Sequence, residues 1–251
     1  MGFVDMRTFT LFCLFCLSVP VFADTLGFRA GVGLWDYTVT GDIRDSVSPS
    51  NKVDLTTDLH IKDDQQSFSY IYFEHPIPLL PNIRLSNTKL TLNGSGPVSK
   101  EFTFNGQLFT SSFDLTTNID LSHSDITLYY EIIDILFDFD IGITAKVFNG
   151  YAELISVEGT TVQSIDATVP LLYANLAVDF GGLDISAELN YLNYDKFTIL
   201  ENIFRVRYTT SYLLGVEVGY RSLYLDIADN DNSLYSNIDI NGPYAGLSFK
   251  F

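Results

Sequence analysis

The sequence predicts an all-β protein, a single transmembrane antiparallel β-barrel of about ten strands. Three observations lead to this fold class: an apolar leader, repeated segments in which apolar and polar residues alternate, and a last strand that ends on an aromatic residue. In residues 244–251 one face is apolar and carries Leu247, Phe249 and Phe251. The other face carries Gly246, Ser248 and Lys250. Such a strand can close a barrel with its apolar face toward lipid, and we expect the three apolar residues to act as its assembly signal.

Residues 1–23 have the pattern of a signal peptide. An apolar stretch from Phe9 to Val21 follows Arg7, and the sequence around Ala23 fits a cleavage site before residue 24. Cleavage would leave a barrel domain over residues 24–251. Cys13 and Cys16 both lie in the leader, so we expect no thiol chemistry in the exported protein. The expected location is the outer membrane of a Gram-negative bacterium.

Ten membrane-spanning strands follow from the period-two alternation. They are predicted at roughly 26–40, 65–75, 82–92, 120–133, 136–148, 165–179, 182–195, 200–211, 214–227 and 236–251. Short turns alternate with longer polar loops, and an even strand number returns the C-terminus to the periplasm. Residues 94–119 fit either an extracellular hairpin or two further strands, so eight or twelve strands remain open. Residues 149–164, and the register of residues 168–179, are also left open.

The same alternation turns most charged strand residues toward the lumen. The acids are Glu74, Asp125, Glu131, Asp138, Asp140, Asp184, Glu188 and Glu217, and the bases are Arg29, Arg84, Lys146, Arg205, Arg207, Arg221 and Lys250. Shifting every strand by one residue would turn them to lipid, at up to about 2–4 kcal/mol for each basic one near mid-bilayer. Because a barrel of this size is narrow, we expect the charges to pair as a plug rather than to line an ion path.

The formal net charge of −17 places the acidic excess in the loops, mainly residues 41–66 and 228–239. We therefore expect a negative outer rim and no nucleic-acid partner. The acidic run 226–233 offers oxygen ligands for a hard cation or for cation-bridged lipopolysaccharide, but a solvated loop is the preferred interpretation. Tyrosines near the strand ends are expected to form an interfacial girdle or to pack in the lumen.

Five stretches resemble a known family. They are 26–35 (LGFRAGVGLW), 73–84 (FEHPIPLLPNIR), 121–132 (LSHSD, then LYYEI), 218–221 (VGYR) and 242–247 (GPYAGL). On these residues the chain is similar to the Gly-Gly-type (OMP_w_GlyGly) outer membrane proteins and, more distantly, to OmpW-like barrels. The resemblance implies a single-domain barrel of undetermined activity. OmpW-like proteins are thought to pass small hydrophobic molecules, but that similarity is too loose to transfer residues.

Histidines offer the only candidate for catalysis. His123 and Asp125 share the inner face, and Ser122 and Ser124 are adjacent, as a hydrolase or acyltransferase at the rim would require. Sequence neighbours of a strand residue point to the opposite face, however, so we expect a hydrogen-bonded rim histidine and no enzyme. His60 is expected in a loop and His75 in a proline-rich turn, so no metal site and no cofactor are predicted.

The sequence thus predicts a monomeric outer membrane barrel with a structural role, or with limited passage of small solutes through a narrow, charge-paired lumen. The alternatives are a rim-active enzyme centred on His123 and an adhesin or receptor that acts through acidic extracellular loops. The expected partners are outer membrane lipid, lipopolysaccharide and, through the C-terminal strand, the barrel-assembly machinery.

Overall fold

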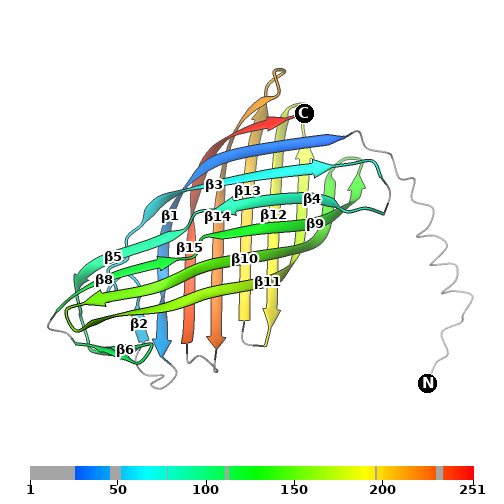
Figure 1. The fold of residues 1–251 in the computed structure, drawn as a ribbon. Coiled ribbons are helices and arrows are strands. Elements are labelled where there is room, and N and C mark those ends of the chain that lie inside the picture. The colour runs from blue at the N-terminus through cyan, green and yellow to red at the C-terminus, as the bar shows by residue number, and fades with distance from the viewer. Residues whose placement is uncertain (1–25, 46–51, 78, 111–112, 196, 230–233) are drawn as a thin grey trace, which may run out of the picture.

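Ten antiparallel strands form a closed ring in a computed structural model that describes residues 26–45, 52–77, 79–110, 113–195, 197–229 and 234–251 (Figure 1). In ring order they are β1 (Gly27–Asp45), β3 (Asp64–Glu74), β4 (Asn82–Thr88), β9 (His123–Asp134), β10 (Asp138–Ser156), β11 (Gly159–Asp179), β12 (Leu183–Tyr194), β13 (Phe197–Thr209), β14 (Leu214–Asp229) and β15 (Leu234–Lys250). Pairing of β15 with β1 closes the ring. The predicted ten-stranded barrel is confirmed, whereas the predicted leader lies outside the described residues.

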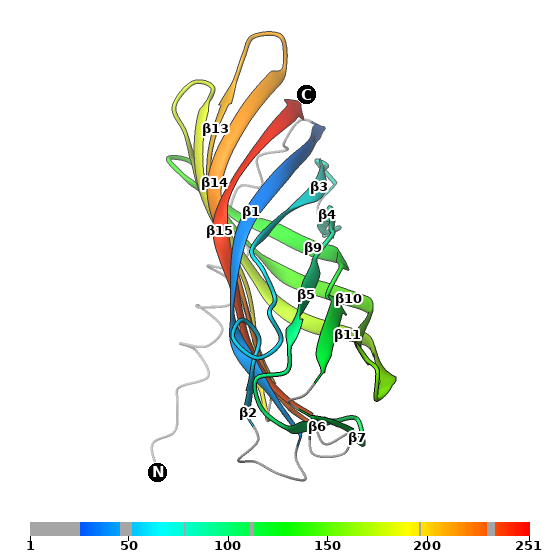
Figure 2. The same cartoon turned by 90° about the vertical axis from the view of Figure 1, so that its left-hand side faces the viewer.

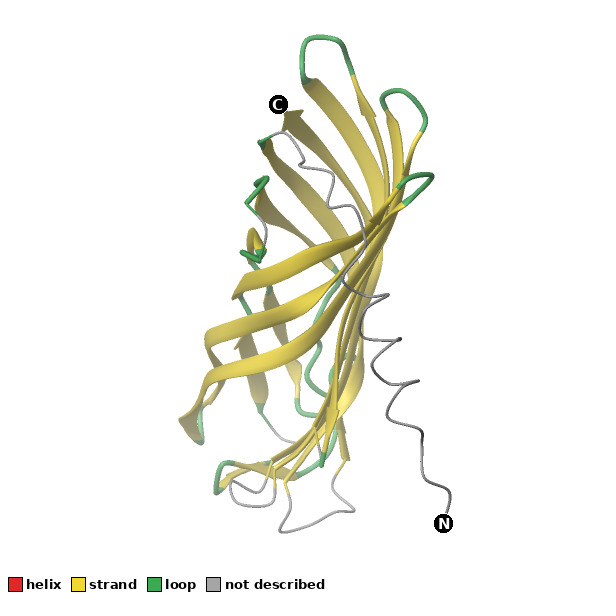
Figure 3. Ribbon diagram, turned by 90° about the vertical axis from the view of Figure 1, so that its right-hand side faces the viewer, coloured by secondary structure: helices red, strands yellow, loops and turns green. Residues whose placement is uncertain are grey.

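The described residues form strands, turns and loops (Figure 3). None of their segments is a helix long and apolar enough to cross a membrane. The first strand begins and the last strand ends at the same end of the barrel, and backbone bonds between Phe28 and Phe251, of 3.1 and 2.8 Å, join them there. Short turns connect β9 to β10, β11 to β12 and β13 to β14 at this end, which is therefore the periplasmic one.

Residues 91–110 and 113–120, which include the described part of 94–119, form an extracellular extension instead of two further spanning strands. They contribute β5 (Thr91–Pro97), β6 (Phe102–Phe104), β7 (Gln107–Phe109) and β8 (Asp114–Asp120). β5 pairs with β8, and β8 pairs with residues 151–155 of β10. Residues 149–164 lengthen β10 and β11 in the same direction. The resulting sheet, ordered β5, β8, β10, β11, leans away from β13 and β14 (Figure 2).

The outer wall carries a wide apolar band. Val32, Leu172 and Val216 are 58%, 66% and 57% exposed, although all three are aliphatic. Toward the extracellular end the outward positions become small and polar on every spanning strand: Asp36, Ser67, Asn87, Ser124, Asn149, Thr168, Asn193, Asn202, Ser222 and Asn241. We call these residues the polar ring. An apolar belt that ends in such a ring matches the wall of a barrel embedded in a bilayer.

Beyond the polar ring, the apolar residues change from the outer face to the inner face. On β1, Val32 and Leu34 point outward, whereas Trp35, Tyr37 and Val39 are buried inside. The same change occurs on β14 and β15, and the connection from β2 (Lys52–Asp54) to β3 adds Leu55, Leu59 and Ile61 from within. One buried apolar cluster therefore fills the extracellular half of the barrel. This packing is expected outside the bilayer, because the outer face of the wall there meets water instead of lipid. Apolar side chains are therefore buried on the inner face.

Candidate functional site

Charged side chains fill the membrane half of the lumen, and one group of four surrounds Lys146. Its ammonium is wholly buried and lies 2.8 Å from Asp125 on β9 and 3.0 Å from Glu201 on β13. Arg221 on β14 donates to Glu201 through Nε at 2.9 Å, and its guanidinium lies 4.7 Å from the ring of Trp35. This group joins strands from opposite sides of the ring, so it bridges the lumen.

Two further groups lie nearer the periplasm. Arg84 on β4 pairs with Glu188 on β12 at 2.8 Å, and Tyr72 donates to the same carboxylate at 3.0 Å. Arg207 on β13 donates to Glu217 at 3.1 Å and to Asp184 at 3.3 Å. Glu217 also accepts from the Tyr70 hydroxyl and lies 3.7 Å from Arg205. Tyrosines and paired charges therefore occupy the same layer.

Within these three groups the charges balance. Their side chains are nearly inaccessible and comprise five bases (Arg84, Lys146, Arg205, Arg207 and Arg221) and five acids (Asp125, Asp184, Glu188, Glu201 and Glu217). Every member lies within 4.0 Å of an opposite charge. Pairing of this kind is what makes ionised groups tolerable away from water. A cavity of about 10 Å³ remains among Arg84, Arg205 and Arg221, room for about one water molecule.

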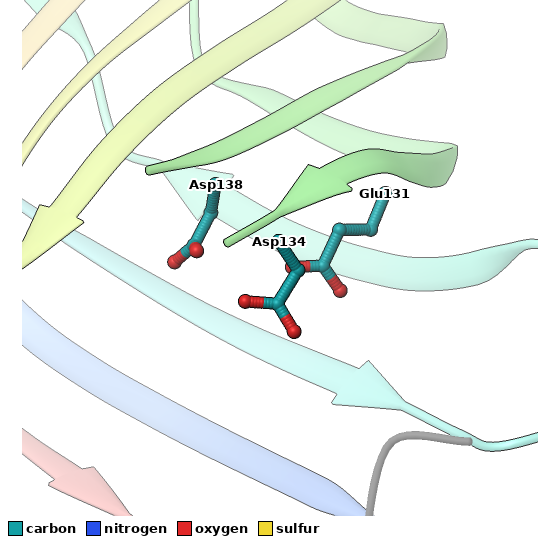
Figure 4. A group of neighbouring side chains, drawn as sticks. All are labelled: Glu131, Asp134 and Asp138. Carbon is teal, nitrogen blue, oxygen red and sulfur yellow. The ribbon is translucent and has the colours of Figure 1, made fainter. Parts of the chain in front are cut away.

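The remaining predicted lumen residues lie at the periplasmic end. Glu74 accepts from Tyr129 at 3.0 Å, Asp140 accepts from Asn175 at 2.9 Å, and Lys250 lies 3.5 Å from Asp179. Arg29 lies over the Tyr72 ring at 5.5 Å. Glu131 and Asp138, together with Asp134, bring their carboxylate oxygens within 4.8 Å of one another (Figure 4). This acidic cluster lies at the periplasmic end of the barrel, and Asp134 is exposed.

Outside the membrane, carboxylates fix the segment that closes the barrel. Asp58 lies 2.8 Å from Lys100, accepts from Ser99 and holds the backbone N–H of Asp54 at 2.9 Å. Burial alone would raise the pKa of the Asp58 carboxyl, but the hydrogen bonds and the charge of Lys100 lower it below its usual range. Residues 230–233 of the acidic run lie outside the described residues.

His123 has both ring nitrogens engaged. Nδ1 lies 2.9 Å from the carbonyl oxygen of Leu121, and Nε2 lies 3.3 Å from an Arg221 nitrogen. A carbonyl only accepts and a guanidinium only donates, so Nδ1 carries the proton and Nε2 accepts. Ser122 accepts from the backbone N–H of Leu90, and Ser124 points outward. The arrangement has no serine nucleophile beside this histidine.

The other two histidines lie in separate turns. His60 is bonded to the carbonyl of Pro97 at 2.7 Å, and His75 to that of Pro81 at 3.1 Å. Each ring contacts a backbone carbonyl of its own, and the three histidines do not converge on a common site in the described chain.

Glu201 is the functional residue that sequence reasoning missed. It has the same parity as Arg205 and Arg207 on β13, and counting back from them along the strand would have placed it inside. The buried tyrosines Tyr70, Tyr72, Tyr129 and Tyr173 form a second apolar cluster next to the charges. Sequence reasoning expected lumen packing as one of two roles for tyrosines.

No protein family model and no curated protein matches the chain. Among solved structures, the outer membrane protease OmpT of Escherichia coli is 11% identical, with 92% of this chain and 100% of that chain covered and a TM-score of 0.55. The Ail protein of Yersinia pestis is 10% identical, with 91% of this chain and 100% of that chain covered and a TM-score of 0.37. The toluene transporter TodX of Pseudomonas putida is also 10% identical, with 93% of this chain and 92% of that chain covered and a TM-score of 0.34. At this identity the likeness to OmpT shows the fold alone, and the other two carry no argument. The fold is that of an outer membrane β-barrel, and the resemblance to the Gly-Gly-type family stays a prediction.

Proposed function

We propose that this protein is a non-conducting outer membrane barrel with a structural role, which holds a rigid extension above the cell surface. The single observation that carries the proposal is the Lys146 group, because a wholly buried ammonium links β9 to β13 across the lumen. The apolar core supports the same conclusion, since it fills the lumen again on the extracellular side. A solute would have to separate paired charges and then displace packed side chains.

The test is single-channel recording with the purified full chain in planar bilayers. We expect a silent bilayer at physiological salt. Steady current through the unaltered protein, or swelling of vesicles in small sugars or amino acids, would establish the alternative role in limited solute passage.

A rim-active enzyme is the weaker alternative. Its only candidate, His123, gives its proton to one neighbour and its lone pair to another. We therefore expect His123→Ala to leave lipid composition and peptide cleavage by intact cells unchanged. We also propose that the protein is a monomer whose C-terminal strand, with Leu247 and Phe249 facing outward, is recognised by the assembly machinery.

A further inference from the structure

The extracellular part of β11 leaves one edge of the sheet without a neighbouring strand. β10 pairs with β11 over residues 159–177, whereas β12 pairs only with residues 172–179. Residues 159–171 are therefore the free edge of the extension formed by β5, β8, β10 and β11 (Figures 1 and 2). Natural proteins usually blunt or cover so long an edge, because its unpaired backbone groups are a template for another strand.

The backbone groups on this edge can be assigned. Phe180 N donates to Leu183 O at 2.9 Å across the β11–β12 turn, so even-numbered residues of β11 direct their backbone groups away from β10. From Thr160 to Thr168 these groups point to the free edge. Two side-chain bonds are made there, from Asn105 to the Val162 carbonyl at 3.2 Å and from Gln163 to the Ser164 carbonyl at 3.4 Å. In the described part of the chain, no backbone group pairs with this edge.

Pro170 marks the end of the edge. It occupies an even position, where its missing N–H costs the β10 ladder no hydrogen bond. The natural sequence therefore already places a proline on this side of β11 within a continuous strand. Further prolines at even positions are expected to be compatible with the fold.

The two faces beside the edge differ in character. On the inner face, Ile165 and Val169 are half-buried and pack with Leu192 against the apolar core. On the outer face, Ser164, Asp166 and Thr168 are exposed. An added strand would cover Ile165 and Val169 with every second side chain and place the others beside Asp166.

Charge selects the partner. The sequence has no lysine or arginine between Lys146 and Lys196. The three acids of the extended hairpin have neutral hydrogen-bond partners: Asn118 for Glu153 at 3.1 Å, Thr110 for Glu158 at 2.7 Å and Ser164 for Asp166 at 2.5 Å. A second copy of this chain would bring the same acids and a net charge of −17. A basic segment would be attracted instead.

We propose that residues 160–168 of β11 bind an extended segment of a partner protein as an added strand, with apolar and basic side chains alternating along it. The backbone of the partner would pair with the even residues of β11. Its apolar side chains would cover Ile165 and Val169, and its basic side chains would lie beside Asp166. The inference goes beyond the proposed function and does not depend on whether the lumen conducts.

The probe is a ten-residue peptide of alternating lysine and valine, titrated onto the full chain in lipid nanodiscs. We expect saturable binding, with slowed amide exchange at Ser164, Asp166 and Thr168. The same peptide N-methylated at alternate amides keeps its charge but cannot pair along one edge, and should bind at least about tenfold more weakly. Ser164→Pro with Thr168→Pro removes two edge donors and should have a similar effect, whereas Ser164→Ala with Thr168→Ala should bind normally.

Three results would overturn the proposal. Equal affinity for the N-methylated peptide would show attraction by charge alone, and failure of the unmodified peptide to bind at millimolar concentration would remove the partner chemistry. If Ser164→Cys forms a disulfide-linked dimer in the absence of peptide, the edge would be assigned to a second copy of the chain. All three readouts are independent of the bilayer recordings, so this inference and the closed-lumen proposal can fail separately.

Discussion

Lys146→Met should destabilise the barrel strongly, because it removes the cation between two buried carboxylates. Asp125 would keep a hydrogen bond from Ser86 at 3.1 Å, and Glu201 would keep Arg221, but the group would carry an unbalanced negative charge. Breaking a buried ion pair from one side typically costs about 3–5 kcal/mol. We expect a loss in that range in the free energy of unfolding, against almost none for Lys62→Met, whose side chain is exposed.

The assay is urea unfolding of protein folded into lipid vesicles, followed by the fluorescence of Trp35. This is the only tryptophan of the chain, and it packs against Arg221 of the same group. The double variant Asp125→Leu with Lys146→Met restores neutrality and should recover more than half of the loss. A cost below about 1 kcal/mol for Lys146→Met, or no recovery in the double variant, would refute the claim that this group is a buried, charge-paired plug.

Three further predictions concern the extracellular segment 52–63 and the closure of the barrel between β1 and β15. Because the pKa of Asp58 is lowered in the folded state, its contribution to stability is complete above the unfolded value of about 3.8 and is lost as pH falls through the lower folded value. Amide exchange of residues 52–63 should therefore speed up as the pH falls below the unfolded value. In Lys100→Met the exchange should be faster already at pH 6 and should change less on acidification. Leu59→Ala should destabilise this segment by about 2–5 kcal/mol, seen as cleavage there by external protease; unchanged resistance would count against the sealed core. Deleting Phe251 removes both backbone bonds to Phe28 and should lower the folded fraction on gels, a result that a wild-type yield would contradict.

Much of the fold could be predicted because the alternation of apolar and polar residues within each strand indicates which face meets lipid. On β10, Ile141 and Ile143 are exposed whereas Thr144 and Lys146 are buried, as period two requires. The extension was harder to predict, because β6 and β7 have three residues each and β8 depends on a β10 that runs beyond the membrane. Pairings that depend on distant strands leave little local signal.

The change of apolar face on β1, from Val32 and Leu34 to Trp35 and Tyr37, can be read in the sequence but looks like an irregularity until the bilayer boundary is known. The charge partners on distant strands could not be predicted, whereas Asp125 faces Lys146, and Glu217 faces Arg207, across hairpins with short turns. Lys146 meets Glu201 from across the lumen, and that contact depends on the tilt and stagger of ten strands together.

The position of the bilayer on this barrel is tested most directly by spin labels on either side of the polar ring. Val216 and Ile155 are both outward-facing and apolar, but only Val216 lies on the membrane side of the ring. Labels at Val216→Cys and Ile155→Cys can be compared in vesicles for collision with oxygen, which favours lipid, and with a water-soluble nickel complex. We predict that the Val216 label meets oxygen and the Ile155 label meets nickel. Nickel access at Val216, or lipid contact at Ile155, would contradict the account.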